Sequence, residues 1–274
     1  MVSEYALAGS REEAVRLVAE DPAALVMGGG TTLMPRAALG QLGGRRVIGL
    51  AHAGLDYVNR NGAMTIGAMT PLRDVAGLSD QPALAAAARS VGSWPLRTTA
   101  TIGGNLLVGE PYGDTAPALL ALDAEINIAG ADGERTIALA DALGDGEPLA
   151  PGELLIEIIV PATDGAVSYL RCARRAAGAP PVVTVAVRVR RATDVVDARI
   201  AISAVGPRAA RATEAEELLI GSPGDDDAVG EAAAAAARAV EPRDDSVASA
   251  WYRRRMTELF VRRALEAAVA EAGR

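Results

Sequence analysis

Hydrophobic and polar positions in the first third of the chain alternate in short blocks, which predicts short helices and strands. Ser10 and Glu13 form a capping box, and apolar residues at 14, 15, 17 and 18 follow on one helical face. The runs Ala24–Met27 and Val47–Leu50 are short and apolar, which indicates buried strands. The N-terminal part is therefore expected to mix helices with strands.

Two hairpin signals mark the middle of the chain. Asn61-Gly62 and Asp132-Gly133 each separate two strand-like runs, and both pairs suit turns whose central residues take positive φ. Leu154–Val160 is almost purely aliphatic and is predicted to be a strand. The alanine-rich residues 82–91 and the apolar residues 115–124 predict two helices.

After residue 162 the pattern changes to long strands followed by helices. The expected strands cover about 167–171, 181–190 and 195–205, and the expected helices cover about 208–220, 226–239 and 246–270. This order is typical of a domain in which one sheet packs against a helical layer. We therefore predict an α+β fold, with a first domain at 1–162 and a C-terminal domain at 163–274 that contains an antiparallel three-stranded sheet.

Composition excludes several kinds of chemistry. All 27 basic residues are arginine, because the sequence contains no lysine, so a Schiff base to PLP and a phosphate-loop lysine are excluded. The single cysteine, Cys172, and the single histidine, His52, cannot build an iron–sulfur cluster or a multi-histidine metal site within this chain. A net charge of −8 with 3% aromatic residues does not fit a nucleic-acid-binding protein.

The sequence shows no sign of membrane insertion or export. No stretch approaches the 18 or so strongly apolar residues of a membrane span. The first residues lack the basic and apolar regions of a signal peptide. A cytoplasmic location is therefore expected.

A glycine–threonine loop directly follows the predicted strand at 24–27. It reads Gly28-Gly29-Gly30-Thr31-Thr32-Leu33-Met34-Pro35. Glycines let backbone N–H groups approach a phosphate without obstruction by Cβ, and two threonine hydroxyls add donors. The loop lacks the Gly-x-Gly-x-x-Gly spacing of a Rossmann turn and the lysine of a Walker loop. Taken alone, such a sequence is more often an ordinary tight turn.

A second loop, from Arg97 to Leu107, reads Arg-Thr-Thr-Ala-Thr-Ile-Gly-Gly-Asn-Leu-Leu, and Asp114 follows at the mouth of a predicted helix. If the two loops converged, their backbone dipoles would hold a diphosphate, and Asp114 could accept hydrogen bonds from sugar-type hydroxyls. The alternative is that Asp114 simply caps the helix. The combined loops would bind a dinucleotide without any lysine.

Four segments carry a family resemblance. They are Gly-Gly-Gly-Thr-x-Leu-x-Pro (28–35), Ile-Gly-Ala-Met-Thr-Pro-Leu (66–72), Arg-x-x-Ala-Thr-Ile-Gly-Gly-Asn-Leu (97–106) and Asp-Thr-Ala-Pro-Ala-Leu-Leu-Ala-Leu-Asp-Ala (114–124). Together they resemble the FAD-binding medium subunit of molybdenum hydroxylases, a family that includes the flavoprotein subunits of carbon monoxide dehydrogenase and xanthine dehydrogenase. The resemblance implies a FAD-binding domain of the vanillyl-alcohol-oxidase-like (PCMH) type, with lobes at about 1–53 and 54–162, plus a C-terminal α+β domain.

The resemblance also implies which residues bind FAD. In the family, the first loop and the Thr-Ile-Gly-Gly-Asn loop hold the pyrophosphate, and Asp114 takes the position of the ribityl-binding aspartate. Ile156 falls where a residue packs near the flavin or adenine. The implied loop residues are Met27, Gly28, Gly29, Gly30, Thr31, Thr32 and Leu33, with Thr101, Gly103, Gly104 and Asn105.

Three further residues have two interpretations each. Ile156 is equally well explained as an ordinary core isoleucine. Arg171 lies where some family members carry a lysine near the isoalloxazine ring, and a cation there could stabilise anionic reduced flavin; the alternative is a surface charge on an edge strand. Cys172 is expected to be a small buried hydrophobe rather than a redox group.

The function that the resemblance implies is that of an FAD-binding electron-transfer subunit. Electrons would leave a substrate on a large molybdopterin-binding partner, cross the [2Fe–2S] clusters of a small partner, and pass by way of FAD to NAD, a quinone or oxygen. One alternative is a stand-alone FAD-dependent oxidoreductase that acts directly on a small molecule or NAD(P)H. Another is a non-catalytic scaffold that has lost flavin.

Overall fold

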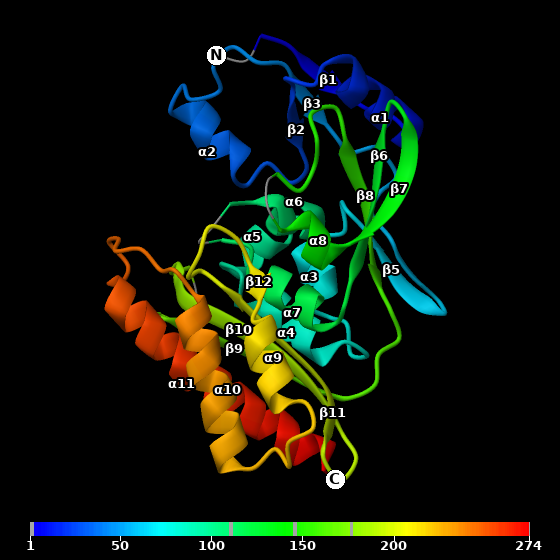
Figure 1. The fold of residues 1–274 in the computed structure, drawn as a ribbon. Helices are drawn as coiled ribbons and strands as arrows, with labels where there is room; N and C mark the ends of the chain where they lie inside the picture. The colour runs from blue at the N-terminus through cyan, green and yellow to red at the C-terminus, as the bar shows by residue number, and fades with distance from the viewer. Residues whose placement is uncertain (1–2, 110–111, 145–146, 176–177, 274) are drawn as a thin grey trace. The chain divides into compact units, whose positions relative to one another are not determined.

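The computed structural model describes residues 3–109, 112–144, 147–175 and 178–273 (Figure 1). The chain divides into two compact units, each assembled from segments that are separate in sequence. The first unit comprises Met1–Val75, Ser93–Val108 and Ala124–Pro161, and the second comprises Ala76–Gly92, Gly109–Asp123 and Ala162–Arg274.

A small parallel sheet begins the first unit. Its strands are ordered β1 (Tyr5–Leu7), β3 (Val47–Gly49) and β2 (Leu25–Met27). Helix α1 (Arg11–Glu20) lies between β1 and β2 in sequence and buries its apolar face. The Ser10 Oγ accepts a hydrogen bond from the Glu13 N–H at 3.2 Å, as the capping box predicts. The Glu13 carboxylate, however, accepts from the N–H of Gly9.

The first unit also contains a five-stranded antiparallel sheet. Its order is β4 (Val58–Asn61), β5 (Ala63–Gly67), β8 (Leu154–Val160), β6 (Glu125–Gly130) and β7 (Gly133–Ala138). Both predicted hairpins are confirmed, with Gly62 at φ 89° and Gly133 at φ 107°, but Asn61 and Asp132 do not take the positive φ that was expected of both turn residues. The aliphatic β8 is the central strand. The remaining short helices are α2 (Leu33–Ala38), α3 (Leu72–Val75), α5 (Trp94–Arg97), α6 (Ile102–Leu107) and α8 (Leu139–Ala142).

The second unit is built on an antiparallel sheet of four strands, so the prediction of three strands was wrong. The order is β12 (Ala210–Arg211), β11 (Val195–Ser203), β10 (Pro181–Arg191) and β9 (Ala166–Ala173). The additional strand, β12, pairs with Ala201 and Ile202. It has only two residues, which is too short to show the alternation that marks a strand in a sequence.

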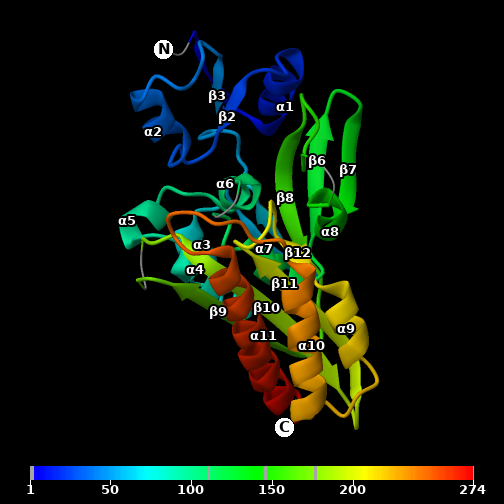
Figure 2. The same cartoon turned by 60° about the vertical axis from the view of Figure 1, so that its left-hand side comes forward.

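One face of this sheet is apolar and is covered by the C-terminal helices. Val183, Val185, Val187 and Val189 alternate along β10 and pack with residues of α9 (Thr213–Leu219), α10 (Asp226–Ala239) and α11 (Ala250–Ala272). Figure 2 shows α10 and α11 side by side on this face. The first of these helices begins later than predicted, because residues 210–211 form the edge strand.

Two helices from earlier in the chain pack on the same sheet. Helix α4 (Pro82–Ser90) contacts β9, and α7 (Ala116–Ala121) contacts β10, β11 and β12. Both come from segments that enter the second unit and leave it again. The continuous domain boundary near residue 163 stays a prediction. Within the described part of the chain, no helix combines the length and apolarity needed to cross a bilayer.

Candidate cofactor site

The two glycine–threonine loops meet within the first unit. A Cβ on Gly29 would lie 1.8 Å from the carbonyl oxygen of Thr99, and a Cβ on Gly28 would lie 2.9 Å from the Thr101 Oγ1. No side chain fits at such distances, so glycine is what allows the two backbones to approach. Through this contact the two loops, which are distant in sequence, lie directly against each other.

The first loop presents a row of backbone donors without acceptors. Among the described residues, the N–H groups of Gly28 to Thr32 donate no hydrogen bond to another part of the chain. Gly30, at φ 69°, turns the backbone, and its carbonyl accepts from the Met34 N–H at 2.8 Å as α2 begins. Successive amides in such a turn form a concave donor surface suited to an anion. This loop therefore fits the pyrophosphate of a dinucleotide.

The second loop differs, because its amides already have acceptors inside the first unit. The Ile102 N–H donates to the Thr70 carbonyl and the Gly103 N–H donates to the Ala68 carbonyl, each at 2.9 Å. Thr101 is the N-cap of α6, and its Oγ1 accepts from the Gly104 N–H at 3.2 Å. The second loop thus packs against the first loop, but these amides already donate to the chain itself and do not form a second row of amides for a ligand.

Ile156 is connected to the second loop through the backbone of Ala68. Its side chain is fully buried in the core of the first unit, which agrees with its interpretation as a core residue. Its carbonyl accepts from the Ala68 N–H at 2.8 Å, and the Ala68 carbonyl accepts from Gly103. A contact between Ile156 and flavin or adenine stays a prediction.

In the second unit, Asp114 and Arg171 form a buried ion pair. The Arg171 Nε donates to the Asp114 Oδ1 at 2.7 Å, and its Nη2 donates to the Ala179 carbonyl at 2.6 Å. Only 10% of the Arg171 side chain and 6% of the Asp114 side chain are exposed. The interpretation of Arg171 as a surface charge was therefore wrong, although β9 is an edge strand. The N-cap of α7 is Thr115, so Asp114 is not that cap.

Burial shifts the pKa values of Asp114 and of its neighbour Tyr169. It raises the pKa of Asp114 above its ordinary value, and the charge and hydrogen bond of Arg171 oppose that rise. Burial, together with the negative charge of Asp114, also raises the pKa of Tyr169. The Tyr169 hydroxyl lies 3.0 Å from the hydroxyl of Ser90, the last residue of α4. The ion pair thus lies beside a buried phenol whose neutral form is favoured mainly by burial.

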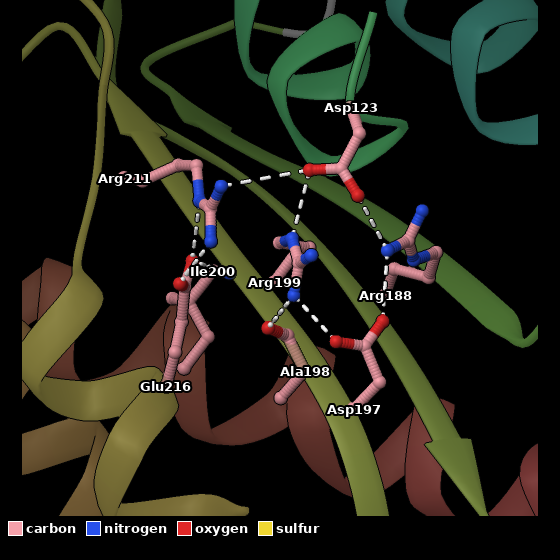
Figure 3. A network of polar contacts seen from close by, with 8 residues as sticks. All are labelled: Asp123, Arg188, Asp197, Ala198, Arg199, Ile200, Arg211 and Glu216. Carbon is pink, nitrogen blue, oxygen red and sulfur yellow. Dashed lines mark hydrogen bonds and ion pairs between the residues drawn. The ribbon is translucent and has the colours of Figure 1, made fainter. Parts of the chain in front are cut away.

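A second charge cluster surrounds Asp123 (Figure 3). Its carboxylate lies 2.7 Å from the Arg188 Nη2, 2.8 Å from the Arg199 Nε and 3.5 Å from the Arg211 Nη1. Asp197 pairs with Arg188 and Arg199. Burial would raise the pKa of Asp197, but hydrogen bonds and charges from these two arginines outweigh it and lower the pKa.

Sequence reasoning missed this cluster. The available signal was Arg188, which stands in the otherwise aliphatic run of β10 and is 4% exposed. A charge at such a position needs a partner. The partner, Asp123, is 65 residues away in sequence, so the pairing itself could not be read from the chain.

The remaining candidate groups are possible metal ligands and Cys172. Among the described residues, no three or more His, Cys, Asp or Glu side chains gather so as to hold a metal ion. Cys172 is half-buried against the core of the second unit, and burial raises the pKa of its thiol. This agrees with its interpretation as a small hydrophobe.

Comparison with known proteins identifies the family. Residues 1–163 match the model of the FAD binding domain in molybdopterin dehydrogenase, and residues 168–268 match that of the CO dehydrogenase flavoprotein C-terminal domain. The glyceraldehyde dehydrogenase medium chain of Sulfolobus acidocaldarius is 28% identical, with 96% of each chain covered. The nicotine 6-hydroxylase medium subunit of Paenarthrobacter nicotinovorans is 31% identical, with 95% of each covered.

A solved structure gives the same result for the fold. A chain of carbon monoxide dehydrogenase from Hydrogenophaga pseudoflava matches with a TM-score of 0.91 and 30% identity, with 98% of each chain covered. The mixed α/β fold is thus that of the medium chain of this enzyme. FAD is the cofactor, and the protein is an FAD-dependent oxidoreductase subunit. The chain belongs to the family of FAD-binding medium subunits of molybdenum hydroxylases.

Proposed function

We propose that this chain is the electron-transfer subunit of a molybdenum hydroxylase-type dehydrogenase. The observation that carries the proposal is the row of amides from Gly28 to Thr32. These amides have no acceptor in the described part of the chain, and Gly29 packs closely against the backbone of Thr99. A pyrophosphate is the group that such a row suits. Bound FAD supplies a redox centre that can take electrons from an iron–sulfur partner and give them to an external acceptor.

The residues of the chain bind and orient the cofactor. Neutral amides of the first loop would hold the pyrophosphate, which explains how a chain without lysine can bind a dianionic group. The second loop would fix the first loop in place. Asp114 would accept hydrogen bonds from ribityl hydroxyls. The residues proposed to bind FAD are Met27, Gly28, Gly29, Gly30, Thr31, Thr32, Leu33, Thr101, Gly103, Gly104, Asn105, Asp114, Ile156 and Arg171.

The proposal includes the fold assignment and the partners. We assign residues 1–162 to a two-lobed FAD-binding domain of the vanillyl-alcohol-oxidase-like type and residues 163–274 to the C-terminal domain. A large molybdopterin-binding subunit and a small [2Fe–2S] subunit would complete the enzyme, with NAD, a quinone or oxygen as acceptor. Relatives that are named medium chain or medium subunit support this organisation. The cytoplasmic location stays a prediction.

Isolation of the native assembly tests the proposal. We expect a tagged chain, recovered from its own organism, to bring down two partners, with molybdenum and iron in the complex and FAD on this chain. Substrate added to the complex should bleach the visible flavin band, and the same substrate added to the isolated chain should not. A chain that is recovered alone and whose FAD is reduced directly by substrate or NAD(P)H would contradict the proposal.

A further inference from the structure

Helix α7 is attached to the sheet of the second unit at both ends. Asp114, two residues before the helix, pairs with Arg171 on β9. Asp123, two residues after it, pairs with arginines of β10, β11 and β12. The segment 109–123 is therefore held by a carboxylate near the point where it enters the unit and by another where it leaves.

The helix itself packs on the sheet through apolar side chains. All six residues from Ala116 to Ala121 are buried and apolar, and their contacts with the sheet are non-directional. A helix of six residues is too short to be stable alone. The two aspartates supply directional contacts between this segment and the sheet, so they help to determine how α7 sits along it.

The Asp123 end has more partners than the Asp114 end. One carboxylate oxygen accepts from Arg199 and the other from Arg188, across neighbouring strands (Figure 3). Arg188 is buried, and its Nε and Nη1 have no hydrogen-bond partner among the described residues. Its pairing therefore depends on Nη2, which donates to Asp123 and Asp197. Asp123 also has a φ of 50°, a conformation that aspartate and asparagine tolerate better than most residues.

We infer that Asp123 is a positioning residue for Asp114. It acts through α7: the arginine cluster fixes the end of the helix, and the helix in turn sets where the Asp114 carboxylate lies. This inference rests on the proposed role of Asp114 toward the ribityl chain of FAD. Loss of the Asp123 charge lets α7 shift, and FAD binding weakens because Asp114 no longer meets its hydroxyl partners.

The test compares Asp123→Asn with Asp197→Asn in the full-length chain. Both variants remove one carboxylate from the same arginine cluster, but only Asp123 belongs to the α7 segment, and asparagine preserves the tolerance for positive φ. We expect Asp123→Asn to weaken FAD binding roughly tenfold and Asp197→Asn to leave it within about twofold. Fluorescence titration measures both dissociation constants.

ADP separates positioning from general damage, because it has a pyrophosphate but no ribityl chain. Asp123→Asn should bind ADP as the wild type does, and Asp114→Asn should show the same selective loss of FAD binding. Equal losses for FAD and ADP, or wild-type FAD binding by Asp123→Asn, would overturn the inference. If Asp123→Asn does not fold, Arg199→Gln tests the same attachment and should show a smaller loss of the same kind. A wild-type chain that binds no FAD would instead refute the proposed function.

Discussion

The glycine–threonine loop of the first unit and the buried ion pairs of the second unit use polar groups in opposite ways. In the first unit, a row of neutral backbone amides is left without acceptors, and ion pairs such as Arg16–Glu20 lie at the surface with more than half of each side chain exposed. In the second unit, ion pairs such as Asp114–Arg171 are buried, and each carboxylate is paired with an arginine of the chain itself. The first arrangement suits a site for an external anion, and the second suits the fixing of one element on another.

The physical reason is the cost of burying charge. A buried ion is strongly unfavourable without a partner, so an arginine inside the sheet must be paired by the protein. A neutral amide that faces a ligand site carries a smaller penalty and still attracts a phosphate. The contrast predicts that changes in the first loop act directly on cofactor affinity, whereas changes in the buried ion pairs act on the free energy of unfolding and reach the cofactor only through Asp114 and Arg171.

The largest effect is expected for Gly29→Ala. The new Cβ would overlap the Thr99 carbonyl oxygen, so the two loops must separate and the amide row loses its shape. FAD affinity should fall by roughly a hundredfold or more, as for loss of several hydrogen bonds to a charged group. Fluorescence titration provides the measurement.

Gly109→Ala is the matched control for this change. Nothing lies within 4 Å of a Cβ built on Gly109, and its φ does not require glycine. This variant should bind FAD as the wild type does. Unaltered FAD binding by Gly29→Ala would show that the contact of the loops is unimportant.

The next largest effect is expected for Arg171→Gln. It leaves the Asp114 carboxylate buried without its ionic partner, which should destabilise the fold by about 3 kcal/mol at neutral pH. Urea unfolding measures the loss, and Arg174→Gln, an exposed arginine at the end of the same strand, should have little effect.

The pH dependence of this loss follows from the raised pKa of Asp114. Because the pKa of Asp114 is higher in the folded chain than in the unfolded chain, protonation of Asp114 stabilises the folded state. This stabilisation is fully present below the ordinary pKa of 3.8 and is lost as the pH rises through the folded-state pKa. Removal of Arg171 raises that pKa further. The deficit of Arg171→Gln should therefore shrink as the pH is lowered from neutral, and a deficit independent of pH would argue against a charge effect.

A smaller effect is expected for Thr101→Ala. This variant loses the cap that holds the Gly104 N–H and should destabilise the first unit by about 1 kcal/mol. Thr101→Ser keeps the hydroxyl and should restore most of that stability in thermal unfolding. If serine fails to restore it, the threonine methyl group, and not the cap, is what matters.

The smallest effect is expected for Glu20→Gln. Its partner Arg16 lies one helical turn away, and both side chains are largely exposed. The free energy of unfolding should change by less than about 0.5 kcal/mol in a denaturant titration. A loss comparable with that of Arg171→Gln would remove the distinction between the ion pairs of the two units.

Local signals in the sequence predicted much of the first unit. The turns at Gly62 and Gly133 were readable because the residues of a tight turn determine its geometry. The glycine triplet likewise indicated a loop whose amides can approach a phosphate; that approach stays a prediction, and the structure adds the contact of Gly29 with Thr99. These features depend on residue types at adjacent positions.

In the second unit the long strands β9 to β11 and the helices were predicted as well, but the contacts that depend on distant partners were not. The edge strand β12 is too short to leave a pattern, and Arg171 was assigned either to the flavin or to the surface because its partner was unknown. Likewise, nothing local indicates that α4 and α7 pack on a sheet formed much later in the chain. Such contacts are set by tertiary packing.

The central claim is that the amides of the first loop hold the pyrophosphate of FAD. The most direct measurement is the affinity of the wild-type chain for FAD compared with riboflavin, which lacks the phosphates. We predict that FAD binds at least roughly a hundredfold more tightly than riboflavin, and that Gly29→Ala removes most of this preference. Equal affinity of the wild-type chain for the two flavins would contradict the account.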